Sequence, residues 1–315
     1  MALRHISQEA AVKASLMLAR IQQFIVANLM LLMSLWVALT WNYSYFVTVM
    51  GLLVFGLGHA AFLALNFGLG YWINRHDPTP HAGIFMLVRA WMGETLMAPR
   101  VFCWQQPFRW NAEPDCFEND PAVRNRRGIV FVHGFICNRG FWNPWLSRLR
   151  QGGHAFSAVN LEPVFGSIDE YAPIIEAAVQ RMTATTGMPP LLVCHSMGGL
   201  AVRAWLSASQ AYGLVHHVIT LGTPHHGTWL GRFSRTANGQ QMRLSSPWLE
   251  QLARGEPHEI SQLLTCYYSN CDNIIFPASN ATLSGADNRL VAGVAHVALA
   301  FDKRVMRESL AMLGL

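Results

Sequence analysis

The sequence predicts an α/β fold, a mostly parallel sheet flanked by helices, that is preceded by two transmembrane helices. The first quarter of the chain contains two long apolar stretches without charge. From residue 127 onward, short apolar runs bounded by turns alternate with stretches of helical periodicity, which is the pattern of βαβ units. Of 315 residues, 52% are hydrophobic and only 13% are charged, an apolar composition for a soluble protein.

The two N-terminal apolar stretches are residues 24–41 and 45–73. At about 1.5 Å per residue, each can cross a hydrocarbon core about 30 Å thick. We therefore predict a membrane anchor over residues 1–77, with spans at about 22–41 and 46–70. A cleaved signal peptide fits poorly, because a second apolar stretch follows at once and no small-residue cleavage motif separates the two.

The charges that flank the spans predict the orientation. Arg4, Lys13 and Arg20 precede the first span, Arg75 follows the second, and the connecting loop has no charge. The positive-inside rule then places both ends in the cytoplasm. We expect a multi-pass protein of the cell (inner) membrane, with the bilayer as a partner and the catalytic domain in the cytoplasm.

Small residues mark one face of the second span. Gly56, Ala60, Ala64 and Gly68 recur at intervals of four, so they share a helical face that another helix can approach closely. We expect the first span to be that helix, which would give a hairpin.

Charge and cysteine content exclude some classes of site. The net charge is +5, but no long Lys/Arg stripe with interleaved aromatic residues is present, so we expect no nucleic-acid partner. The oligomeric state stays open. The six cysteines lack C-x-x-C spacing, which argues against zinc; they are Cys103, Cys116, Cys137, Cys194, Cys266 and Cys271. Pairs 103–116 and 266–271 could form disulfides in an oxidising compartment, whereas a cytoplasmic domain favours free thiols.

The rest of the chain divides into a connecting segment, 78–126, and a predicted catalytic domain, 127–315. The connecting segment contains an amphipathic helix over Ala82–Met97. The expected strands are Gly128–Val132, Ala155–Asn160, Leu191–His195, His217–Leu221, Leu263–Tyr268 and Leu290–Val294, and the expected helices include Ile168–Thr185 and Gly198–Ala211. Residues 228–260, apolar around Trp248 and Leu249, are either a lid or an ordinary surface loop.

The stretch LLVCHSMGGLAVRAW, residues 191–205, indicates a strand, a sharp turn at Ser196 and a helix. Reacting groups of α/β sheets collect at the carboxyl ends of strands. A nucleophile in such a turn needs small residues two positions before and after it. Gly198 meets this need, and Cys194 stands where glycine is usual. Cys194 is a poor nucleophile itself, because burial raises the pKa of a thiol.

Partners for Ser196 follow later strands. His296 comes after the last expected strand, and Asp272 after the strand before it; this chain order, Ser-Asp-His, suits the architecture. Asp287 precedes the last strand, so we expect it at the opposite end of the sheet. We therefore predict Ser196 as nucleophile, His296 as base and Asp272 as the acid that orients it.

Two backbone N–H groups are candidates for an oxyanion hole. Met197 directly follows the serine, and Phe135 follows Gly134 in the loop after an early strand. Three histidines are candidates for lining a substrate pocket. His133 lies in the same H-G-F loop, and His225 and His226 follow the strand His217–Leu221.

Together, His133-Gly134-Phe135, CHSMGG, LGTPHHGT, YYSNCDNII and GVAHVAL resemble bacterial lipases and esterases of the α/β-hydrolase superfamily, of the triacylglycerol-lipase type. The last two are similar to the acid and histidine loops of small Bacillus-type lipases. The resemblance covers about 127–315 and not the hairpin. It implies a Ser196-Asp272-His296 triad that hydrolyses carboxylic esters without a metal or other cofactor. Such lipases also tolerate alanine at the position of Cys194.

The sequence thus predicts a membrane-anchored serine hydrolase that cleaves esters of lipid-like acyl substrates through an acyl-enzyme intermediate. An acyl thioesterase or acyltransferase that uses the same triad is an alternative. A catalytically inactive membrane scaffold is an alternative of another class.

Overall fold

The computed structural model describes residues 2–117, 126–210, 212–257 and 259–313. Residues 118–125 of the predicted connecting segment, 211 of a predicted helix and 258 of the predicted lid lie outside the described residues. So do the side chains of residues 2–16, including Arg4 and Lys13 among the charges used to predict orientation.

The centre of the molecule is a six-stranded sheet in which every pairing is parallel. The strands are β1 (Ile129–Val132), β2 (Phe156–Ala158), β3 (Leu191–His195), β4 (His217–Leu221), β5 (Leu264–Tyr268) and β6 (Asp287–Leu290), in the spatial order β2-β1-β3-β4-β5-β6. The predicted fold class is therefore confirmed.

The position of the last strand was predicted wrongly. The expected strand was Leu290–Val294, whereas β6 is Asp287–Leu290. The cause is that β6 is an edge strand paired only with β5, so its Asp and Asn side chains can face solvent. The apolar residues after it form a turn whose Val291 is buried.

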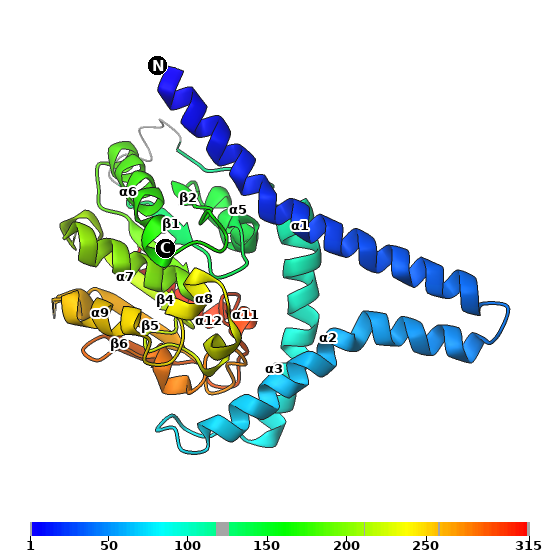
Figure 1. The fold of residues 1–315 in the computed structure, drawn as a ribbon. Coiled ribbons are helices and arrows are strands. Elements are labelled where there is room, and N and C mark those ends of the chain that lie inside the picture. The colour runs from blue at the N-terminus through cyan, green and yellow to red at the C-terminus, as the bar shows by residue number, and fades with distance from the viewer. Residues whose placement is uncertain (1, 118–125, 211, 258, 314–315) are drawn as a thin grey trace.

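Helices cover both faces of the sheet (Figure 1). Val130 and Val132 of β1 contribute to a core shared with α6 (Ala172–Thr186), α7 (Met197–Ser209) and α9 (Pro247–Gly255). Ile129 and Phe131 face a second core shared with α5 (Asn143–Gln151) and α12 (Lys303–Ala311). The shorter helices are α4 (Gln106–Phe108), α8 (Ala237–Gln241), α10 (Glu259–Gln262) and α11 (His296–Leu299).

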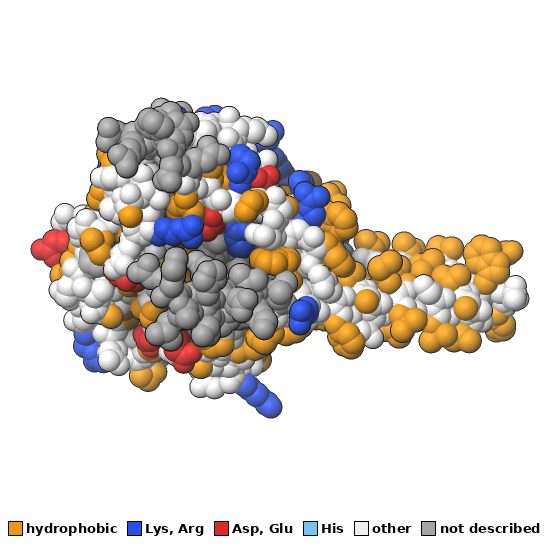
Figure 2. Space-filling model, turned by 90° about the horizontal axis from the view of Figure 1, so that it is seen from above, with side chains coloured by type: hydrophobic (Ala, Val, Ile, Leu, Met, Phe, Trp, Pro, Cys, Tyr) orange, Lys and Arg blue, Asp and Glu red, His pale blue; other side chains and the backbone are white. Residues whose placement is uncertain are grey.

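The N-terminal helices α1 (Ala2–Thr40) and α2 (Tyr45–Asn74) form a hairpin that projects from the α/β domain (Figure 1). By length and composition alone, Met17–Thr40 and Tyr45–Asn74 could each cross a membrane. Hydrophobic side chains cover the projecting part in Figure 2. Near its tip, the Trp36 indole donates to the Thr48 carbonyl at 3.2 Å, and this ring lies against Gly51.

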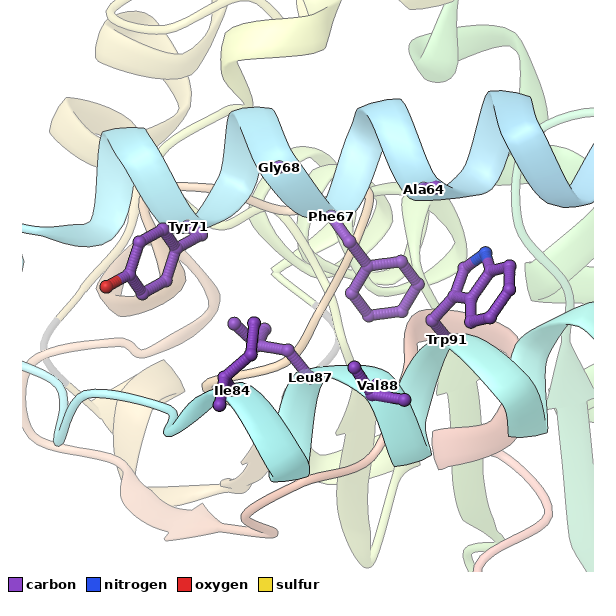
Figure 3. A pocket seen from close by; sticks show the side chains of 8 residues that line it. All are labelled: Ala64, Phe67, Gly68, Tyr71, Ile84, Leu87, Val88 and Trp91. Atoms are coloured by element: carbon purple, nitrogen blue, oxygen red, sulfur yellow. The ribbon is translucent and has the colours of Figure 1, made fainter.

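The predicted partner of the small-residue face is wrong. Ala64 and Gly68 line a groove between α2 and α3 (Ile84–Pro99), not a contact with α1 (Figure 3). The Ala60 carbonyl accepts a hydrogen bond from the Trp91 indole of α3 at 2.8 Å. Helix α3 takes this place because the chain turns back after α2, through the segment of Pro78 and Pro80.

Helix α3 begins and ends two residues later than the predicted Ala82–Met97. It continues through a π-helical turn, η1 (Arg100–Gln105), into α4. Asn138 ties α4 to the α/β domain, since its side-chain amide donates to the Gln106 carbonyl at 3.0 Å and its N–H to the Gln106 side chain at 2.9 Å. The hairpin is therefore joined to the domain by packed structure.

Candidate active site

Ser196 occupies the turn between β3 and α7, with φ 54° and ψ −128°. A residue other than glycine held in such a sparsely populated region costs about 1–3 kcal/mol. Two hydrogen bonds hold the turn in place. The Ser196 N–H donates to the Leu221 carbonyl at 2.9 Å, and the Thr223 hydroxyl donates to the Ser196 carbonyl at 2.8 Å. This is the backbone geometry of a nucleophile elbow, which presents a serine hydroxyl beyond the end of a strand.

The turn also requires two close backbone approaches. A Cβ added at Gly198 would lie 2.5 Å from the Val132 carbonyl oxygen, and one added at Gly134 would lie 2.8 Å from the Ser196 Cβ. Cys194 is completely buried, and this burial raises the pKa of its thiol. Its surroundings are those of a packing residue rather than of a reactive thiolate.

Asp272 and His296 form a buried pair, each 4% exposed. The His296 Nδ1 lies 2.8 Å from the Asp272 Oδ2. The other carboxylate oxygen accepts from the N–H groups of Ile274 (2.8 Å) and Ile275 (2.7 Å), which fixes the orientation of the carboxylate. Burial is the largest single influence on the pKa of His296 and lowers it, but the charge and hydrogen bond of Asp272, together with the charge of Glu94, raise it, and the net shift is upward.

The sheet brings these groups to one edge. Ser196 follows β3, and the loops that carry Asp272 and His296 follow β5 and β6. Gly222 lies beside the Asp272–His296 pair, since a Cβ added there would be 3.1 Å from both the Asp272 Oδ2 and the His296 Nδ1. Asp287 pairs with Thr265 at the start of β6, at the opposite end of that strand.

The two predicted oxyanion donors also lie at this edge. Met197 is the first residue of α7, and the first N–H groups of a helix have no partner within it. Within the described part of the chain, the Phe135 N–H forms no backbone hydrogen bond. Phe135 directly follows Gly134, whose backbone touches Ser196.

The three histidines proposed as pocket residues differ in their surroundings. His133 is buried and bonded at both ring nitrogens, since it accepts from the Leu161 N–H at 3.1 Å and donates to the Gly134 carbonyl at 2.9 Å. Burial lowers its pKa to about 4. His225 is buried and within 3.2 Å of both Arg203 and Thr220. His226 is exposed.

His195 is a supporting residue that sequence reasoning missed. Its Nε2 donates to the His296 carbonyl at 3.1 Å, and the two rings lie 4.6 Å apart. The His195 ring also stacks on the Phe141 ring, with the ring centroids 4.6 Å apart. The residue next to the serine thus supports the backbone of the histidine loop.

Glu94 of α3 is the second missed residue, and it is 1% exposed. Its carboxylate accepts from the N–H groups of Val297 (3.0 Å) and Ala298 (3.1 Å), the two residues after His296. Burial raises the pKa of Glu94 to about 7. In turn, its negative charge is one of the influences that raise the pKa of His296.

Replacing Glu94 by Gln should shift the acidic limb of the kcat/KM profile to lower pH. The carboxylate charge favours protonated His296, so without it the imidazole stays neutral, and able to accept a proton, at lower pH. One of the two hydrogen bonds is also lost, which should lower the plateau about tenfold. A pH series with p-nitrophenyl esters measures both effects. A lower plateau with an unmoved limb would reduce Glu94 to a purely structural residue.

The loop that carries Asp272 rests on the end of α2. A Cβ at Gly70 would lie 3.6 Å from the Asp272 carbonyl. The Asn74 side chain accepts from the Ala278 N–H at 2.9 Å, and the Asp77 carboxylate accepts from the Ser279 N–H at 3.2 Å. The acid loop therefore contacts α2, as the histidine loop contacts α3.

A family model of the alpha/beta hydrolase family matches residues 129–307. The chain belongs to this family. The match spans all six strands together with Ser196, Asp272 and His296, and it begins after the hairpin and α3. No curated protein matches this hydrolase significantly.

Solved lipase structures resemble the hydrolase in fold. The mature form of the Bacillus licheniformis lipase BlEst2 is 19% identical, covers 62% of this chain and 93% of its own, and superimposes with a TM-score of 0.54. Aspergillus fumigatus lipase B is 15% identical and covers 65% of this chain and 57% of its own, with a TM-score of 0.53. At these identities the likeness shows the shared fold.

Proposed function

We propose that this protein is a membrane-anchored serine hydrolase that cleaves carboxylic esters of lipid-like acyl substrates. The observation that carries the proposal is the 2.8 Å Asp272–His296 pair at the same sheet edge as the strained turn of Ser196. The lipase names of the structural neighbours support an ester as the substrate. The two apolar helices support the anchor.

In the proposed mechanism, His296 takes the proton of Ser196 as its oxygen attacks the ester carbonyl. Asp272 holds the imidazole in the tautomer with hydrogen on Nδ1 and stabilises its positive charge. The N–H groups of Phe135 and Met197 bind the oxyanion. His296 then protonates the leaving alcohol, and a water molecule that it activates releases the acid from the acyl-enzyme.

Ser196 is 7% exposed, and a lid that moves would widen access to it. We propose residues 228–260 as the segment that moves. It begins with η5 (Trp229–Phe233) and includes α8 and α9. The Trp229 ring packs against Phe276 in the acid loop, while Asn238 anchors α8 to the Val164 carbonyl at 2.9 Å.

Hydrolysis of p-nitrophenyl esters of graded acyl length by the full-length protein tests the proposal, with acyl-CoA substrates in parallel. We expect ester hydrolysis, together with covalent labelling by a fluorophosphonate probe that is absent in Ser196→Ala. Faster turnover of acyl-CoA would favour the thioesterase or acyltransferase. Folded protein that neither labels nor hydrolyses any of these substrates would favour the inactive scaffold.

A further inference from the structure

Helix α3 has two faces of opposite character. Leu87, Ala90 and Glu94 are buried. Leu87 and Ala90 pack in a cluster that includes Phe67 of α2 and two residues of the α/β domain, and Glu94 bonds to the histidine loop. At 3.6 residues per turn, Phe85 is half a turn away from Glu94, and it is 88% exposed. We define the α3 apolar face by its large exposed side chains: Ile84, Phe85, Val88, Met92 and Leu96. The helix therefore lies between the domain and the medium that covers this face.

The apolar face continues in both directions. Further along the chain, Trp104 of η1 and Phe108 of α4 are also exposed, and their rings lie 5.8 Å apart. On the side of α2, the α3 apolar face borders the groove of about 280 Å³ between α2 and α3, because Ile84 and Val88 belong to both (Figure 3). A contiguous exposed apolar surface of this kind marks an interaction site.

Charge indicates what the face contacts. Arg89 and Arg100 are exposed beside it, and among the described residues neither has an ion-pair partner. The one acidic residue of α3, Glu94, points to the other side. An apolar face flanked by arginines, with aromatic residues at its ends, is typical of a helix at the surface of a membrane with anionic headgroups.

The position of α3 relative to the hairpin also fits a helix at the surface of a membrane. Helix α3 crosses α2 steeply, and its continuation through η1 and α4 crosses α1, where the hairpin leaves the α/β domain (Figure 1). At the crossings, the Gln23 side chain donates to the Pro107 carbonyl at 2.7 Å, and His59 donates to the Thr95 carbonyl at 3.0 Å. A helix that crosses a membrane-spanning hairpin at its base lies along the membrane plane.

The length of the hairpin determines how deep α3 would lie in the membrane. From Gln23, which contacts α4, to the end of α1 at Thr40 the first arm is about 17 residues, or about 26 Å. From the start of α2 at Tyr45 to His59, which contacts α3, the second arm is about 14 residues, or about 21 Å. A hydrocarbon core is about 30 Å thick. The remaining distance, about 4 Å along one arm and about 9 Å along the other, is within one helix width of about 10 Å, so the hairpin spans the core when the α3 apolar face lies in its outer layer.

We infer that α3 is an interfacial helix, with its apolar face and the α2–α3 groove covered by phospholipid and its opposite face against the loop of His296. This inference rests on the membrane anchoring in the proposed function. It makes α3 a direct contact between lipid and the candidate active site.

The chain contains a natural reporter position. Cys103 is exposed between Arg100 and Trp104, whereas the other five cysteines are buried. A thiol-reactive NBD fluorophore on Cys103 of the full-length protein can be read in proteoliposomes of phosphatidylcholine and phosphatidylglycerol. The quenchers are aqueous iodide and lipids spin-labelled either near the headgroup or near the middle of the acyl chain. Met92→Cys in a Cys103→Ser background reports the centre of the face.

Two further variants in the Cys103→Ser background are controls. Leu32→Cys lies midway along the projecting arm, and Ala208→Cys lies on the exposed end of α7. We expect both α3 labels to lose most of their quenching by iodide and to be quenched best by the shallow spin label. The label at 32 should be quenched best by the deep spin label, and the label at 208 by iodide alone.

The outcomes are distinguishable. If iodide quenches the α3 labels as it quenches the label at 208, while the label at 32 responds to the deep spin label, the inference is wrong and the anchoring stands. If the α3 labels are shielded from iodide but insensitive to both lipids, protein such as a second copy covers the face, which also overturns the inference. If the label at 32 is insensitive to both lipids, the anchoring itself fails.

Discussion

Ser196→Ala should lower kcat for ester hydrolysis by about 10⁴- to 10⁶-fold. The serine oxygen is the only proposed nucleophile, and the oxyanion donors and the base do not form an acyl-enzyme without it. Steady-state assays with p-nitrophenyl esters, together with fluorophosphonate labelling, measure the loss. The turn should keep its shape, since its hydrogen bonds are made by the backbone of residue 196 and the Thr223 side chain.

Cys194→Ala is the matched control for this variant. It changes the buried side chain two residues earlier, and we expect kcat within a few-fold of the original protein, because the thiol is inert in its buried site. Retention of most activity by Ser196→Ala, with loss in Cys194→Ala, would make the thiol the nucleophile and overturn the assignment.

Asp272→Asn should lower kcat by about 10⁴-fold. The asparagine oxygen can still accept from Ile274 and Ile275, as Asp272 does. The amide NH₂ then faces the His296 Nδ1, which must become an acceptor. The ring hydrogen moves to Nε2, and the imidazole can no longer accept the serine proton. The same ester assay measures the loss, and unchanged thermal unfolding would show that the fold is intact.

Asp287→Asn is the control for the acid. This carboxylate is closer to His296 in sequence, but it lies at the start of β6, where it pairs with the Arg289 side chain at 2.7 Å. We expect little change in kcat. An equal loss in both variants would contradict the assignment of Asp272.

Much of the candidate site could be predicted from local sequence because topology converts chain order into position. The bounds of β3 and β4 match the predicted strands, and parallel strands place the loops at their carboxyl ends along one edge of the sheet. Reasoning of this kind selected Asp272 over Asp287. It placed β6 wrongly because apolar runs mark strands that are buried, and an edge strand with polar side chains gives no such signal.

Glu94 could not be found in this way. Its contacts lie 203 and 204 residues further along the chain. Glu94 itself belongs to none of the sequence motifs that identify the other residues of the site. A weaker signal exists in hindsight: it is the one acid of an apolar helix and shares the helical phase of the buried Leu87 and Ala90. An acid on the buried face of an amphipathic helix implies a partner elsewhere, since a buried carboxylate is costly without one.

The acid loop contacts α2 and the histidine loop contacts α3, so the distance between the candidate acid and base depends on the two helices that we propose to lie in and on the membrane. A hairpin accommodates a thicker or thinner bilayer by changing its tilt. A change of tilt would move both loops. The His296 Nδ1 and the Asp272 Oδ2 must stay about 2.8 Å apart for the pair to work. For the proposed membrane-anchored hydrolase, we therefore expect the catalytic rate to depend on bilayer thickness, with no effector bound.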